Sequence, residues 1–157
     1  MPLIKLNATQ GLTGTLPAVS GANLTNIDGG KILQVKQAVR TDTFSTSSTS
    51  FTGAGMSVSI TPASASNKIF CMLNIVGGPG NNVSMFLRIV RGSTAIHVGD
   101  SAGSRFQATA GASDDPSNQF QLQMSGSVLD SPNTTSSTDY YIQMATEGSG
   151  NTGTCYI

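Results

Sequence analysis

This chain of 157 residues contains few of the side chains on which most enzymes and most charge-driven binding proteins depend. It has no Trp, two Cys and one His, and charged residues make up 10% of the sequence, whereas about 25% is usual for a soluble domain. Eight basic and eight acidic side chains leave no net charge. Because a neutral surface attracts neither nucleic acid nor anionic lipid, we expect no nucleic-acid partner and no membrane partner.

The residues that could carry chemistry stand without partners in the sequence. His97 is the only histidine, and neither a nucleophilic serine motif nor a second metal ligand accompanies it. The adjacent Asp114 and Asp115 precede a proline, which is typical of a solvated turn rather than of two carboxylates held across a sugar. Arg88 and Arg91 flank apolar positions, which favours a solvated strand face, with pairing to carboxylates at a subunit contact as the alternative. We therefore predict that the protein is not an enzyme and has no catalytic residue, no cofactor and no metal site.

The N-terminus and the two cysteines bear on the cellular compartment. The first residues lack a basic region followed by a long apolar run, so we expect no secretory signal. No stretch approaches the roughly 18 apolar residues that span a bilayer. Cys71 lies in an apolar run and Cys155 near the end of the sequence. Because disulfides are not favoured in the cytosol, we expect two buried thiols, with a Cys71–Cys155 disulfide as the alternative.

The sequence is rich in short stretches that alternate between apolar and polar residues and are separated by Gly, Pro and Asn. Such stretches predict strands and turns. The expected strands are 32–39, 56–60, 69–76, 83–91, 94–98, 105–110, 120–128, 140–146 and 153–157. Stretch 69–76 is almost continuously apolar, which predicts a strand covered on both faces. Because no helical crossovers separate the strands, we predict an all-β domain, an antiparallel β-sandwich or jelly roll, over 32–157.

Residues 1–31 differ from the rest and are expected to form an extended, irregular N-terminal arm. Gly and Pro interrupt every possible helix or strand, so the arm cannot build its own core. It is nevertheless too apolar for a solvated linker. We expect it to become ordered only on the surface of a partner, which its apolar residues would contact. These partner-binding residues are Leu3, Ile4, Leu6, Leu12, Leu16, Val19, Leu24 and Ile27.

Five segments of the chain carry a resemblance to a known group of proteins. They are 1–7 (MPLIKLN), 11–25 (GLTGTLPAVSGANLT), 59–69 (SITPASASNKI), 87–96 (LRIVRGSTAI) and 129–138 (LDSPNTTSST). With these segments the chain resembles small structural proteins, decoration or tail-fibre-like, from the virions of tailed bacteriophages of aquatic bacteria. The resemblance implies a β-sandwich that often forms homotrimers. Proteins of this group commonly continue beyond the equivalent of 154–157 with another strand, so we expect a sheet edge here that the arm or a neighbouring subunit covers.

The resemblance implies a structural protein of the virion, assembled in the cytoplasm of the bacterial host. Our leading hypothesis is a capsid decoration or cement protein, a homotrimer whose arm lies on the major capsid protein and stabilises the shell. The alternative is a tail-fibre or receptor-binding subunit, attached by the same arm to a tail component. Loops 77–82, 114–118 and 132–138 would then face the host surface, where a glycan could be bound.

Overall fold

The computed structural model describes residues 32–80, 83–113, 121–147 and 153–156. The chain divides into two compact units, Met1–Gln34 and Val35–Ile157, and the fold below is that of the second unit. The predicted arm, residues 1–31, lies outside the described residues.

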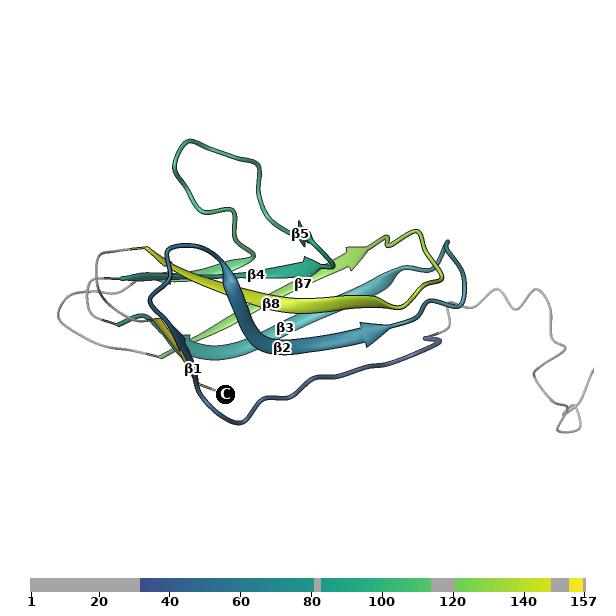
Figure 1. The fold of residues 1–157 in the computed structure, drawn as a ribbon, viewed down its shortest axis with the longest axis horizontal. Helices are drawn as coiled ribbons and strands as arrows, with labels where there is room; N and C mark the ends of the chain where they lie inside the picture. The colour runs from purple at the N-terminus through teal and green to yellow at the C-terminus, as the bar shows by residue number, and fades with distance from the viewer. Residues whose placement is uncertain (1–31, 81–82, 114–120, 148–152, 157) are drawn as a thin grey trace, which may run out of the picture. The chain divides into compact units, whose positions relative to one another are not determined.

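The described part of the chain is all-β and contains no helix, as the sequence predicts (Figure 1). Most strands fall within a few residues of their expected positions. The strands are β1 (Phe44–Thr46), β2 (Thr52–Ile60), β3 (Ile69–Gly78), β4 (Ser84–Arg91), β5 (Thr94–Ile96), β6 (Ala110–Ser113), β7 (Leu122–Asp130), β8 (Thr138–Glu147) and β9 (Gly153–Tyr156).

The strands form two antiparallel sheets. Sheet A has the order β1-β9-β3-β7, and sheet B has the order β2-β8-β4-β5, with β6 also paired to β4. The longest pairing runs from Ile69 opposite Asp130 to Gly77 opposite Leu122. β5 and β6 occupy the same edge of β4 in turn, so residues 97–109 leave the sheet between them and return to it. Thr109 marks the return, because its amide donates to the Leu87 carbonyl at 2.8 Å.

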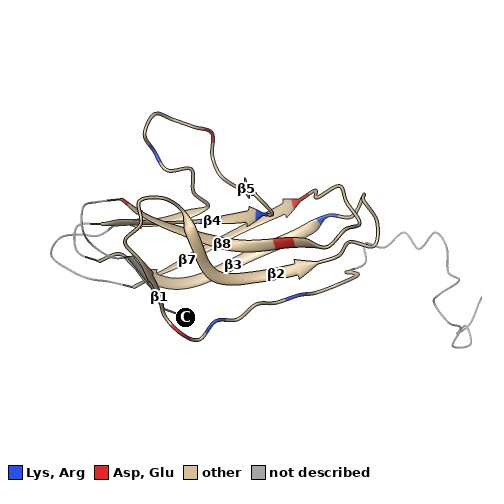
Figure 2. Ribbon diagram, viewed as in Figure 1, with Lys and Arg blue, Asp and Glu red and all other residues tan. Residues whose placement is uncertain are grey.

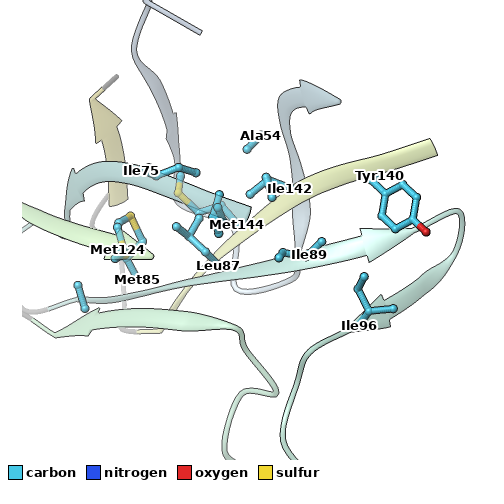
Figure 3. Close-up of a cluster of buried hydrophobic side chains, with 12 residues drawn as sticks. Ala54, Ile75, Met85, Leu87, Ile89, Ile96, Met124, Tyr140, Ile142 and Met144 are labelled. Atoms are coloured by element: carbon cyan, nitrogen blue, oxygen red, sulfur yellow. The ribbon is translucent and has the colours of Figure 1, made fainter. Parts of the chain in front are cut away.

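One hydrophobic core lies between the two sheets (Figure 3). The centre of β4 alternates between buried and half-buried side chains, because successive residues of a strand point to opposite faces. Met85 and Leu87 of β4 and Met144 of β8 are fully buried. They belong to the same cluster as Ile75 and Met124 of sheet A, so the sheets pack face to face.

Three expectations about strands were wrong. Residues 32–43 contain no strand, although 32–39 alternates, because alternation becomes a strand only where a neighbouring strand pairs with it and no described strand does. The strand expected at 105–110 begins only at Ala110. β3 is covered on one face rather than two, since Phe70 and Met72 are exposed. An apolar run alone does not reveal whether a second layer covers it.

One edge of β3 is only partly paired within the described part of the chain. β9 pairs with this strand only over Val76–Gly78, and no described strand pairs with the same edge over Ile69–Ile75. Along this edge, the inward side chains of β3 become less buried with increasing distance from β9. Ile75 and Leu73 are buried, whereas Cys71 and Ile69 are half-buried.

Candidate interaction surfaces

The exposed apolar side chains of the described residues are confined to two parts of the molecule. One part is the segment 32–43, which precedes β1, and the other is the β3–β7 pair of sheet A. The large apolar residues concerned are Ile32, Leu33, Val35, Val39, Phe70, Met72, Val76, Leu122 and Leu129. None of them belongs to sheet B. Clustered exposed apolar residues, unlike scattered ones, indicate a surface that a partner covers.

The β3–β7 pair presents an outward surface that we call the A face. It consists of eight exposed side chains in cross-strand register: Phe70 opposite Leu129, Met72 opposite Ser127, Asn74 opposite Ser125, and Val76 opposite Gln123. None of the eight is charged. The charged residues near these strands lie at their ends, where Lys68 precedes β3 and Asp130 closes β7 (Figure 2). At the end of the face opposite to Phe70 and Leu129, Gln123 Nε2 donates a hydrogen bond to Asn74 Oδ1 at 2.9 Å.

On sheet B, in contrast, the outward aromatic residue Phe86 is covered by the chain's own loop. The ring of Phe86 on β4 stacks on Phe106 of the 97–109 loop, with centroids 4.7 Å apart and planes at 10°. Phe51 packs edge-on against Phe106 at 5.7 Å. The Arg88 guanidinium lies 4.0 Å from the centroid of Phe51, and its Nε donates to Gln143 Oε1 at 2.8 Å. Arg88 is therefore held in a packed cluster rather than on the solvated strand face that the sequence suggests.

A second polar cluster, which we call the clasp, ties the two sheets together at one end. Arg91 Nη1 of β4 lies 2.7 and 2.8 Å from the two carboxylate oxygens of Asp130 on β7. The Tyr140 hydroxyl of β8 donates to Asp130 Oδ2 at 2.6 Å. Burial, and then the hydrogen bond and charge of Asp130, raise the pKa of Tyr140. Arg91 is thus paired within its own chain, not solvated.

Cys71 lies beside the clasp and carries a free thiol. Burial, reinforced by the negative charge of Asp130, raises the pKa of Cys71 to about 11. Such a thiol stays protonated at neutral pH and is a poor nucleophile or metal ligand. The sheet register places Cys155 opposite Gly77, six positions along β3 from Cys71. Six strand residues span roughly 20 Å, well beyond the reach of a disulfide, so the Cys71–Cys155 alternative was wrong.

The other residues considered from the sequence are not brought together into a site. His97 has a positive φ of 55° and is exposed, and it follows β5 rather than lying within the strand that the sequence predicts over 94–98. Asp114 and Asp115 lie outside the described residues, as do all eight predicted partner-binding residues of the arm. Within the described ranges, no three His, Cys, Asp or Glu side chains gather where they could hold a metal ion.

The A face and the clasp were both missed by reasoning from the sequence. A signal for the A face was present, because the apolar run 69–76 supplies side chains to both faces of its strand. The described residues include no helix long and apolar enough to cross a membrane. No protein-family model, curated protein or solved structure matches the chain.

Proposed function

We propose that this protein is a structural component of a bacteriophage virion, a homotrimeric capsid decoration or cement protein that stabilises the shell. The observation that carries this proposal is that, among the described residues, the large exposed apolar side chains are confined to segment 32–43 and the β3–β7 pair. A structural protein that functions by binding to other subunits needs exposed apolar surfaces of this kind. A neutral, charge-poor chain also causes little electrostatic repulsion between copies. The resemblance to small phage virion proteins supplies the particular setting.

We also propose that the fold is a jelly roll. The pairings support this, because the chain folds back on itself as a ribbon in which β1 pairs with β9, β2 with β8, β3 with β7, and β4 with β6. Wrapping that ribbon brings β8 beside β4 and β9 beside β3. Jelly rolls are common in viral capsid proteins and lectins. The fold is therefore compatible with both virion hypotheses.

In the proposed mechanism the arm attaches the trimer to the major capsid protein. Val35 and Val39, which follow the arm in the sequence, are exposed, and the apolar residues of the arm itself would add to them. A buried Leu or Ile contributes roughly 1.5–3 kcal/mol, and ordering each backbone residue costs about 1–2 kcal/mol. Because the two contributions are similar, attachment should depend on the arm's apolar residues together with repetition over many copies.

The test is to add purified protein to particles that lack it and to measure bound copies after sedimentation. We expect the full chain to bind and a chain without residues 1–30 to remain a folded trimer that does not bind. Near-normal occupancy by the truncated chain would refute attachment through the arm. Loss of the soluble trimer on truncation would instead assign the arm to subunit assembly.

A tail-fibre or receptor-binding subunit is the second candidate. The observation in its favour is loop 97–109, which rises away from β4 and β5 (Figure 1) and is held to the sheet by Phe106. Exposed loops on a rigid sheet often carry recognition. Locating the protein by electron microscopy of labelled particles, at the head or at the tail, distinguishes the two candidates.

A further inference from the structure

We propose that the A face is the surface through which copies of this chain associate, so that β3 and β7 of each copy face the axis of the oligomer. The inference rests on the proposed homotrimer and names the surface that forms it. The occupant of the A face is accordingly a second copy of the same chain.

The A face has the character of a surface that needs to be covered. Met72 is 79% exposed and Phe70 is 60% exposed, yet both lie on a long, well-paired strand rather than in a loop. Leu129 lies directly opposite Phe70 and is exposed as well. Covering these side chains removes contiguous apolar surface from water, which favours association.

The absence of charge on the A face selects a second copy as the occupant. Identical faces that meet around a symmetry axis bring identical side chains close together, so charged residues would repel one another. All eight side chains of the A face are neutral, although the described chain carries charges on several other strands and loops. The amides of Asn74 and Gln123, which already bond to each other, can also exchange hydrogen bonds with their equivalents across the axis.

The other outward surface is less suited to this role. Phe86 on sheet B is covered by Phe106 of the same chain, and Arg88 places a cation beside it. The A face measures roughly 20 by 10 Å, because its four residue pairs extend over seven positions of each of two strands. That is less than the ~800 Å² per partner of a standard stable interface, so the contact must extend beyond the A face.

The test measures the mass of the full-length chain in solution by light scattering and native mass spectrometry, for wild type and for Met72→Lys. The wild type is expected at about 48 kDa, three times the 16.1 kDa of one chain. Met72→Lys is expected at the mass of a monomer, with an unchanged circular-dichroism spectrum. Ser57→Lys is the matched control, because it adds the same charge at an exposed strand position of sheet B, and it should remain trimeric.

A second variant guards against misfolding. Ser127→Lys places a lysine directly opposite Met72 without removing an apolar side chain, and it should also be monomeric. A Met72→Lys or Ser127→Lys protein that remains trimeric would overturn the assignment of the A face to contacts between copies. If such a trimer also failed to bind particles, the A face would instead be the surface that contacts the capsid shell. A monomeric wild type would refute the proposed trimer itself, and the A-face assignment with it.

Discussion

Replacing Asp130 with asparagine should destabilise the fold strongly, because this substitution removes the charge at the centre of the clasp. Asp130 accepts hydrogen bonds from Arg91 Nη1 at 2.7 and 2.8 Å and from the Tyr140 hydroxyl at 2.6 Å. The Asp130 side chain is 10% exposed and that of Arg91 26% exposed. Asparagine keeps the shape but leaves the Arg91 cation without its counter-ion, with an amide nitrogen facing another donor.

The size of the effect follows from the burial of the two partners. Removing one partner of a fully buried ion pair costs about 3–5 kcal/mol, whereas an exposed pair contributes about 0–1 kcal/mol. Water still reaches part of Arg91 and replaces some of the lost interaction. We therefore expect Asp130→Asn to lower the free energy of unfolding by about 2–3 kcal/mol. This corresponds to a melting temperature lower by about 10 °C.

The assay is urea denaturation followed by circular dichroism, at one protein concentration because association makes the midpoint depend on concentration. Asp42→Asn is the matched control, since Asp42 also pairs with an arginine, Arg40, at 2.8 Å but is itself exposed. The control should unfold like the wild type. If Asp130→Asn lost no more stability than Asp42→Asn, the argument that the clasp holds the sheets together would be refuted.

Three further predictions concern other parts of the domain. Gly126→Ala should lower the free energy of unfolding by about 1–2 kcal/mol, because the alanine β-carbon would lie 2.6 Å from Thr109 Cγ2. A denaturation midpoint equal to that of the wild type would show instead that Thr109 moves aside at no cost. Phe106→Ala should speed tryptic cleavage after the exposed Arg105 severalfold by releasing the loop, and an unchanged rate would show that the aromatic stack does not restrain it. With the other cysteine replaced by serine, alkylation of Cys71 should rise only as pH approaches about 11, rather than near the ordinary pKa of 9.0. Because the thiol ionises at a lower pH in the unfolded chain than in the folded one, its contribution to stability should be present below pH 9.0 and should decline as pH rises toward about 11. An alkylation midpoint near pH 9.0 would contradict the argument that burial raises the pKa of Cys71.

The alternating strands are the part of the fold that could be predicted from the sequence. Strand β7 was expected over 120–128 and spans Leu122–Asp130, with Met124 buried in the core. Alternation is a local property that records which residues share a face. It does not record pairing, which is why 32–39 alternates and yet forms no strand.

The candidate surfaces required the tertiary structure. The apolar run 69–76 predicts a strand, but whether Phe70 and Met72 are covered depends on how many layers the domain has. The clasp is similar, because Arg91, Asp130 and Tyr140 lie on three strands that meet only after the sheets have formed. From the sequence alone, Arg91 and Asp130 look like ordinary surface residues, and Tyr140 looks like an ordinary aromatic residue of a strand.

The sequence by itself determined the all-β class, the positions of most strands and turns, and the neutrality that suits association between copies. Only the tertiary structure decided that β9 lies between β1 and β3, that β3 keeps one apolar face exposed, and that Arg91 has a partner within the chain. The physical reason is that strand periodicity depends on neighbouring residues. Pairing and layering, in contrast, depend on contacts between residues far apart in the sequence, such as Phe44 and Cys155, which lie opposite each other on β1 and β9.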